Sequence, residues 1–87
     1  MKCRRCGNVM RFLGFIVEET GTVLLDDEDF KTINAYGVFG VYACDKCKII
    51  KEEFIEEFSD IIDAYEFVEE DLGGCWAKIP KDYVALP

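Results

Sequence analysis

Four cysteines form two C-x-x-C pairs, and these pairs carry the residue types and spacing best suited to chemistry. Cys3 and Cys6 enclose two arginines, whereas Cys44 and Cys47 enclose an aspartate and a lysine. Two thiolates on a tight turn can bind one ion, and two such turns brought together complete a tetrahedral shell of sulfur. Because thiolate is a soft ligand, this set selects zinc or iron rather than magnesium or calcium. The sequence therefore predicts a metal site at these four cysteines.

Two other uses of the cysteines stay open. Two disulfides in a secreted domain would use the same even number of cysteines, but no apolar signal sequence follows Met1, and Cys75 would lack a partner. A redox-active dithiol would use one pair and leave the other unexplained. Cys75 itself is expected to be a small buried apolar residue, with a reactive thiol as the alternative. Metal binding accounts for both pairs and is the preferred interpretation.

The paired cysteine turns, the first of which reads Cys-x-x-Cys-Gly, resemble the zinc ribbon and the related rubredoxin-like metal-binding fold. The resemblance covers about residues 1–50. It implies either a structural zinc in a ribbon that contacts protein or nucleic acid, or a single iron that carries electrons. Lys48 stands where the second rubredoxin turn usually has glycine, and no proline lies between Cys44 and Cys47. These departures favour zinc as the cofactor, with iron as the alternative.

Composition restricts the functions that the chain can have. Its 87 residues include 18 acidic and 10 basic side chains and no histidine, which gives a formal net charge of -8. Without histidine, the chain cannot build a Ser/His/Asp or a Cys/His nucleophilic centre. Four cysteines would also fill the coordination position that a catalytic zinc keeps open. We therefore expect a non-enzymatic, cytoplasmic module that binds zinc and mediates protein–protein interaction, with a rubredoxin-like iron electron carrier as the alternative.

Basic residues gather near the cysteine pairs, whereas acidic residues fill the segment after the second pair. A nucleic-acid surface is one interpretation of the basic group, and an electrostatic offset of the thiolates is the other. The strongly negative total charge makes nucleic acid the less favoured partner. The candidate nucleic-acid-binding residues are Arg4, Arg5, Arg11, Lys46 and Lys48.

The elements that must position the cysteines are expected to be β-strands. An apolar run over residues 9–17, turn residues over 18–21 and a short returning strand over 22–25 predict a β-hairpin. A second strand block runs over residues 32–44 and ends at the second cysteine pair. A hairpin of this kind would bring the two cysteine turns together.

The segment after Cys47 has the period of an amphipathic helix. Apolar residues spaced by three and four positions predict a helix over about residues 48–72, ended by Gly73 and Gly74. Such a helix is about 37 Å long at 1.5 Å per residue, which exceeds the diameter of a compact chain of this size. It must therefore project, pair with a partner or break, and Ser59 and Asp60 are the favoured break because either can cap a second helix.

The predicted fold class is α+β in one domain, 1–87. A zinc ribbon occupies residues 1–50, and a long amphipathic helix and a docked apolar tail occupy residues 51–87. The aromatic members of the helical stripe are the candidate partner-binding residues, either for another protein or for a second copy of the chain. These residues are Phe54, Phe58 and Tyr65, and burial in the chain's own core is their alternative role.

Overall fold

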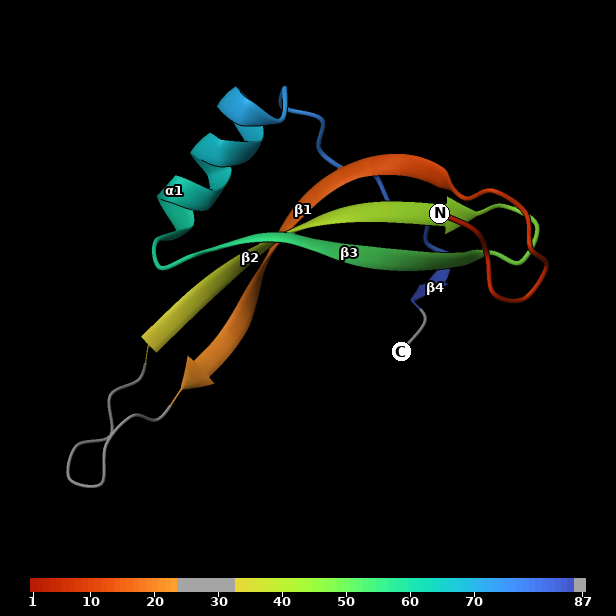
Figure 1. The fold of residues 1–87 in the computed structure, drawn as a ribbon, viewed down its shortest axis with the longest axis horizontal. Coiled ribbons are helices and arrows are strands. Elements are labelled where there is room, and N and C mark those ends of the chain that lie inside the picture. Colours follow the sequence, from red (N-terminus) through yellow and green to blue (C-terminus); the bar gives the residue numbers. More distant parts are fainter. Residues whose placement is uncertain (24–32, 86–87) are drawn as a thin grey trace.

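The computed structural model describes residues 1–23 and 33–85, and most of this chain forms one curled, four-stranded mixed sheet (Figure 1). The strands are β1 (Arg11–Val23), β2 (Ile33–Cys44), β3 (Ile49–Phe58) and β4 (Val84–Ala85). Their order in the sheet is the order in the chain. The pairs β1–β2 and β2–β3 are antiparallel, and the short β4 lies parallel to the start of β3.

The prediction of a long amphipathic helix over residues 48–72 is wrong. The α+β architecture built around that helix is therefore wrong as well. The first half of the segment is strand β3, and the second half is a short helix made of α1 (Ile61–Glu66) and the π-helical turn η1 (Phe67–Asp71). Ile49 and Ile50 at the start of β3 are buried, and four of the remaining eight residues are glutamates. In this strand apolar residues alternate with pairs of glutamates, and that spacing also fits one apolar face of a helix.

The helix begins at the break expected near Ser59 and Asp60. The Asp60 side chain caps α1, because its Oδ1 accepts a hydrogen bond from the Ile62 amide at 2.8 Å. Gly73 and Gly74 follow the helix with φ angles of 78° and 70°, the left-handed conformation in which glycine ends helices. The capping residues were therefore predicted correctly, although the helix they enclose is much shorter.

Strand β1 continues through the turn expected at residues 18–21. Glu18 pairs with Gly37 and Glu19 with Tyr36, and a bulge after Glu19 accommodates Thr20. The expected hairpin turn at this place is therefore wrong, since pairing with β2 overrides the local turn preference. The remainder of the predicted returning strand, residues 24–25, lies outside the described residues. Strand β2 matches the predicted block closely and ends at Cys44 as expected.

The C-terminal tail docks on β1 and on β3, the two strands that flank β2. At β1, the Phe15 amide donates to the Cys75 carbonyl at 2.7 Å, and the Ala77 amide donates to the Phe15 carbonyl at 2.9 Å. Gly14 permits this approach, because a Cβ atom there would stand 2.6 Å from the Cys75 oxygen. At β3, the tail forms β4, so it crosses from β1 to β3 (Figure 1).

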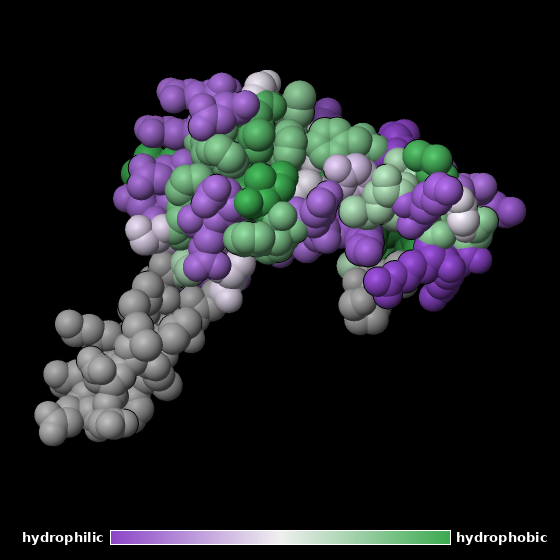
Figure 2. Space-filling view, viewed as in Figure 1, coloured by the Kyte–Doolittle hydropathy of each residue, from purple (hydrophilic) through white to green (hydrophobic). Residues whose placement is uncertain are grey.

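The core is divided between the two faces of the sheet. On one face, α1 and η1 cover Val38 with Ala64 and Val68, all fully buried. On the other face, Val41 and Ala43 pack with Ile50. Figure 2 shows hydrophilic side chains gathered around the outside of the helix. Within the described residues, no helix is long and apolar enough to cross a membrane.

Candidate metal centre

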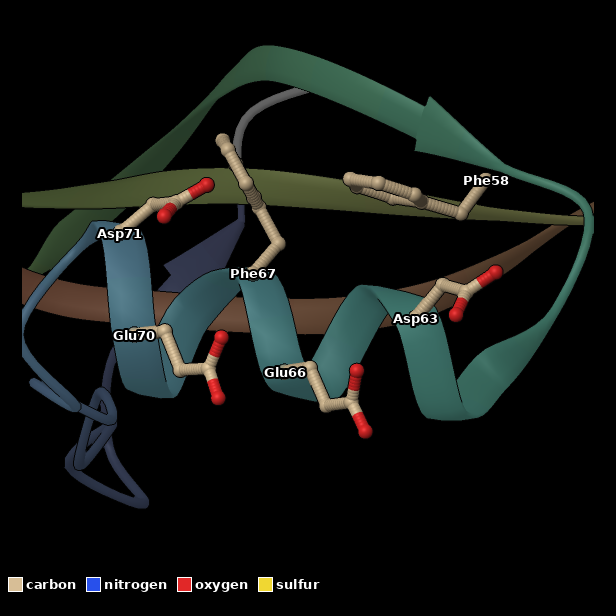
Figure 3. A pocket seen from close by; sticks show the side chains of 6 residues that line it. All are labelled: Phe58, Asp63, Glu66, Phe67, Glu70 and Asp71. Carbon is tan, nitrogen blue, oxygen red and sulfur yellow. The ribbon is translucent and has the colours of Figure 1, made fainter.

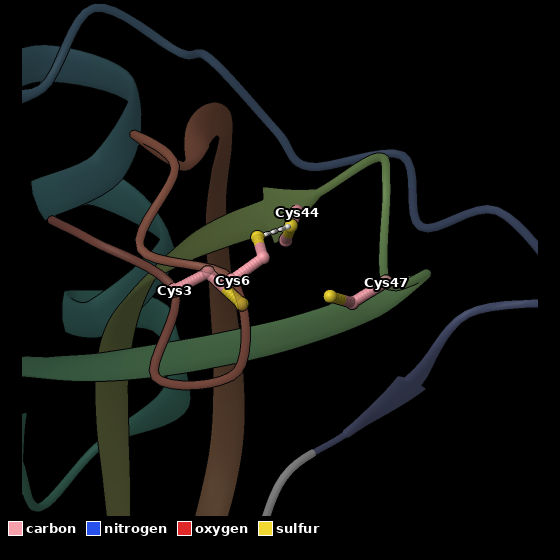
Figure 4. Close-up of side chains that lie close together, drawn as sticks. All are labelled: Cys3, Cys6, Cys44 and Cys47. Atoms are coloured by element: carbon pink, nitrogen blue, oxygen red, sulfur yellow. Dashed lines mark hydrogen bonds between the residues drawn. The ribbon is translucent and has the colours of Figure 1, made fainter.

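The four cysteines of the two C-x-x-C pairs meet at one end of the sheet (Figure 4). All four Sγ atoms lie within 4.8 Å of one another. Antiparallel pairing of Arg11 with Ala43 explains the meeting, because it places the start of β1 beside the end of β2. The first cysteine turn precedes β1, and the second joins β2 to β3. The sheet thus brings together two turns that are far apart in the chain.

The first turn is closed by its own backbone. The Gly7 amide donates to the Cys3 carbonyl at 2.9 Å, and the Cys3 amide donates to the Asn8 carbonyl at 2.8 Å. Gly7 has a φ of 73°, a left-handed conformation that glycine adopts at little cost. This conformation turns the chain back after Cys6 so that Asn8 pairs with Cys3.

The second turn has the same shape although it lacks the glycine. Lys48 has a φ of 52°, and it is the only residue other than glycine with a positive φ among those that the structure describes. A side chain in this conformation costs about 1–2 kcal/mol. The two turns therefore share a left-handed residue after the second cysteine, and at Lys48 this conformation has an energetic cost that glycine avoids.

The sulfur cluster is partly shielded from solvent. Cys3 and Cys44 are buried, whereas Cys6 and Cys47 are half-buried. Met10 and Ile49 are also buried in the same cluster. Apolar surroundings of this kind exclude water and favour a closed coordination shell over an open one.

The surroundings of the thiols separate their pKa values. The Cys6 backbone amide, donating to the Cys3 sulfur, is the main cause that lowers the pKa of Cys3 to about 7. Burial is the main cause that raises the pKa of Cys47 to about 12. The Sγ atoms of Cys6 and Cys44 lie 3.4 Å apart and share a hydrogen bond. A bound divalent cation would supply the positive charge that four thiolates in one place require.

A carboxylate between the two ligands of the second turn is held by side chains from two distant elements. The Arg11 guanidinium donates to Asp45 from Nε at 3.1 Å and from Nη2 at 3.0 Å, and the Tyr83 hydroxyl donates at 2.6 Å. The Arg11 hydrogen bonds and then the Tyr83 hydrogen bond lower the pKa of Asp45 to about 2. The sequence analysis missed Asp45 and Tyr83, and only the position of Asp45 between two cysteines signals its role.

The basic residues proposed to bind nucleic acid lie at the same end of the sheet. Arg4, Arg5 and Lys46 are exposed on the two cysteine turns. Arg11 and Lys48 are also exposed, but each pairs with a carboxylate, Asp45 at 3.0 Å and Asp82 at 3.2 Å respectively. The positive charge of two of the five candidates is therefore locally compensated.

The three aromatic residues expected along one helix face lie on different elements. Phe54 lies in β3, is 55% exposed and contacts Phe39 with a ring separation of 5.8 Å. Phe58 ends β3 and packs on the core, whereas Tyr65 lies in α1. The expected continuous aromatic stripe is therefore wrong, because it depended on one long helix.

Cys75 stands apart from the four clustered cysteines. It lies in the tail, where its carbonyl pairs with Phe15, and its side chain is exposed. The expectation that Cys75 is a small buried apolar residue is therefore wrong. The backbone pairing, rather than burial of the thiol, explains its position.

Comparison with known proteins gives this chain no relative. No protein-family model matches it, and neither the curated proteins nor the solved structures include a significant match. The cysteine cluster is compatible with a site of the zinc-ribbon kind, and this likeness depends on the ligand arrangement alone.

Proposed function

We propose that this chain is a structural zinc-binding module in which Cys3, Cys6, Cys44 and Cys47 hold one zinc ion. The observation that carries the proposal is the cluster of four Sγ atoms within 4.8 Å of one another. Four sulfurs at zinc–sulfur distances of about 2.3 Å stand about 3.8 Å apart around a tetrahedral ion. Only a small inward movement of the side chains is needed to reach that geometry.

The donor set favours a structural role over a catalytic one. Four cysteines complete the zinc shell, whereas catalytic zinc usually has histidine or carboxylate ligands and an open position. The chain has no histidine to offer. Reduced thiolates also fit a reducing compartment such as the cytoplasm. In this proposal zinc stabilises the cysteine end of the sheet, and the protein acts through the surfaces that this end supports.

Protein is the partner class that we favour over nucleic acid. Arg11 and Lys48 are engaged with carboxylates, and the chain carries a net charge of -8. Phosphate binding needs several free cations, and a negative molecule repels a nucleic acid as a whole. Arg4, Arg5 and Lys46, which form no ion pair among the described residues, offer a weak surface for such a partner.

A rubredoxin-like iron electron carrier is the second candidate. Cys6 and Cys47 are only half-buried, which places two ligand sulfurs near the surface, where an electron can leave. Iron in this site would give visible absorption and reversible one-electron reduction. Zinc would give neither.

The test is the metal content of the full chain purified under reducing conditions, with Cys44→Ser and Cys75→Ser as a matched pair of variants. We expect one zinc per chain in the parent and in Cys75→Ser, and a loss of at least about tenfold in zinc affinity for Cys44→Ser. One iron per chain that returns after reconstitution with iron would support the electron carrier. A parent that binds neither metal, or a Cys44→Ser variant that binds as well as the parent, would contradict the site.

A further inference from the structure

Most of the outer edge of β3 has no partner strand within the residues that the structure describes. β4 covers only Ile49 and Ile50, and among residues 1–23 and 33–85 no strand pairs with the outer edge over residues 51–58. An exposed strand edge presents backbone donors and acceptors in the spacing that another extended chain requires. This edge is therefore a surface on which a further strand can be added.

The orientation of the free backbone groups follows from the docked tail. The Val84 amide donates to the Lys48 carbonyl at 3.0 Å, so this carbonyl points away from β2. Peptide groups alternate in direction along a strand, and the register with β2 is regular from Cys44 opposite Ile49 to Phe39 opposite Phe54. The amides of Glu52 and Phe54 therefore point outward along the edge.

The side chains of the edge define the chemistry of its occupant. Phe54 and Ile55 are 55% and 37% exposed, which leaves apolar surface on both sides of the strand. The strand is strongly acidic, and Lys51 is its single cation. Its acidic residues are Glu52, Glu53, Glu56 and Glu57. A segment that alternates basic and apolar side chains complements this surface in charge and in hydrophobicity.

The acidic surface continues beyond the strand. A pocket of about 200 Å³ opens between the end of β3 and the helix (Figure 3). Phe58, the last residue of β3, and Phe67 provide its two aromatic rings, with centroids 5.2 Å apart. Carboxylates complete the lining: Asp63, Glu66, Glu70 and Asp71. A chain that follows the edge therefore meets further negative charge at its end.

A second copy of this chain is a poor occupant of the edge. Pairing two β3 strands would bring glutamates of one copy against glutamates of the other, and like charges across a strand pair are destabilising. The outer edge of β1 is also less suitable, because Trp76 docks at Phe15 and a bulge follows Glu19.

We propose that the outer edge of β3 binds an extended basic segment of a partner protein, which joins the sheet as an additional strand. The proposal deepens the protein-interaction role proposed above by naming the surface and the kind of partner. It leaves the metal content unaffected, so measuring zinc in each sample separates a failure of this proposal from a failure of the zinc site.

The first test uses the zinc-loaded full chain and two fluorescent decapeptides with five lysines each: one alternates lysine with valine, and the other has five prolines placed mostly in adjacent pairs. Both carry the same charge, but adjacent prolines remove amide hydrogens from both sides of an extended peptide, so neither side can pair continuously with an edge. We expect the lysine–valine peptide to bind at least about tenfold more tightly in anisotropy titrations, with affinity that falls as salt rises. Equal binding of the two peptides, or no binding of either, would overturn the proposal.

The second test locates the bound peptide by hydrogen exchange. The amides of Glu52 and Phe54 are expected to exchange more slowly when the lysine–valine peptide is bound. Peptide binding that leaves the exchange of both amides unchanged would refute strand addition. Slow exchange of these amides without peptide, together with a doubled mass of the protein in solution, would assign the edge to a second copy.

A matched pair of charge reversals completes the design. Glu53 in β3 and Glu19 in β1 are both exposed and lie on the two strands that flank β2. Both substitutions change the total charge equally, but only Glu53 lies on the proposed binding strand. We therefore expect Glu53→Lys to weaken peptide binding by about tenfold and Glu19→Lys to weaken it much less. Equal losses would reduce the effect to net charge and overturn the assignment to the β3 edge. The peptide and exchange tests on the parent protein stand even if a variant fails to fold.

Discussion

Lys48 is the residue at which the second cysteine turn departs most from the first. Its left-handed conformation, at φ 52°, is the one that Gly7 adopts at φ 73° in the first turn. Its ion pair with Asp82 is exposed and contributes little to stability. The conformation of Lys48 is therefore a local energetic cost that the rest of the fold must offset.

We predict that Lys48→Val lowers the free energy of unfolding by about 1–2 kcal/mol, because a β-branched side chain fits this conformation poorly. Lys48→Gly should leave it unchanged or raise it by up to about 1 kcal/mol, since glycine removes the conformational cost. Denaturant titrations in a fixed excess of zinc measure both. Lys46→Gly is the control, because Lys46 has no positive φ and the change should be destabilising there. A stabilising Lys46→Gly and a destabilising Lys48→Gly would contradict this account.

Glu52 gives a second prediction for a single residue. Burial first, and then the Glu18 side chain, raises the pKa of Glu52 above its ordinary value. A carboxyl whose pKa is raised by folding binds its proton more tightly in the folded state, so its ionisation destabilises the fold as pH rises. The penalty is fully present above the raised pKa and absent in acid below the ordinary pKa of a glutamate.

Glu52→Gln should therefore raise the free energy of unfolding at pH 7 by about 0.5 kcal/mol or less, since solvent screens this partly exposed group. The difference should shrink as the pH falls from 7 to 5, a range that avoids the stronger acid in which thiolates release zinc. Denaturation at the two pH values measures it, with Glu53→Gln on the opposite face of β3 as the control for loss of one negative charge. A gain that is equal at both pH values would contradict the prediction.

Among the elements, the tail depends on one close backbone approach. A Cβ atom at Gly14 would stand 2.6 Å from the Cys75 oxygen and 2.7 Å from the Ala77 nitrogen, and both are backbone atoms that cannot rotate away. A Cβ at Gly40 would meet only side chains, at 3.5 Å or more. The two glycines therefore make a matched pair on the same sheet.

We predict that Gly14→Ala displaces the tail from β1 and lowers stability by about 2 kcal/mol or more, whereas Gly40→Ala costs much less. Trp76, the single tryptophan, pairs with Phe15 and reports the displacement through its fluorescence. A red-shifted emission is expected for Gly14→Ala alone. An unchanged spectrum in both variants would show that the tail tolerates the added carbon.

The elements also show how far a single sequence can predict this protein. The cysteine cluster was predictable because two C-x-x-C turns need only a hairpin to meet. Strand β3, which stands where a helix was expected, was not predictable from the sequence. Its conformation depends on pairing with β2, and no local pattern records that pairing. The contact of Asp45 with Tyr83 was hidden for the same reason, since it joins residues far apart in the chain. Local patterns thus predicted ligands and caps, and long-range pairing determined the rest.

At the scale of the whole molecule, the core has two ends joined by the long strands and by the tail. One buried cluster surrounds the cysteines with Met10 and Ile49, and another holds the helix on Val38. The tail belongs to both, because Trp76 packs near the helix and Tyr83 holds the second cysteine turn through Asp45. Loss of the metal should therefore act unevenly along the chain.

We predict that chelation of the proposed zinc ion loosens the cysteine end, with its attached end of the tail, before the helix end. Structural zinc contributes on the order of 10 kcal/mol to folding, and it would stabilise the end of the sheet where the four thiolates meet.

The amides of Val84 and Gly74 are suited to the comparison, because Val84 donates to Lys48 in the second turn and Gly74 donates to Val68 at the end of the helix. After chelation, hydrogen exchange should quicken much more at Val84 than at Gly74. Tyr83→Phe should increase the exchange of Val84 even with zinc bound, because it removes the hydrogen bond to Asp45. Equal acceleration at both amides would mean that the two ends unfold as one unit, and no change at Val84 would mean that the tail is held independently of the metal.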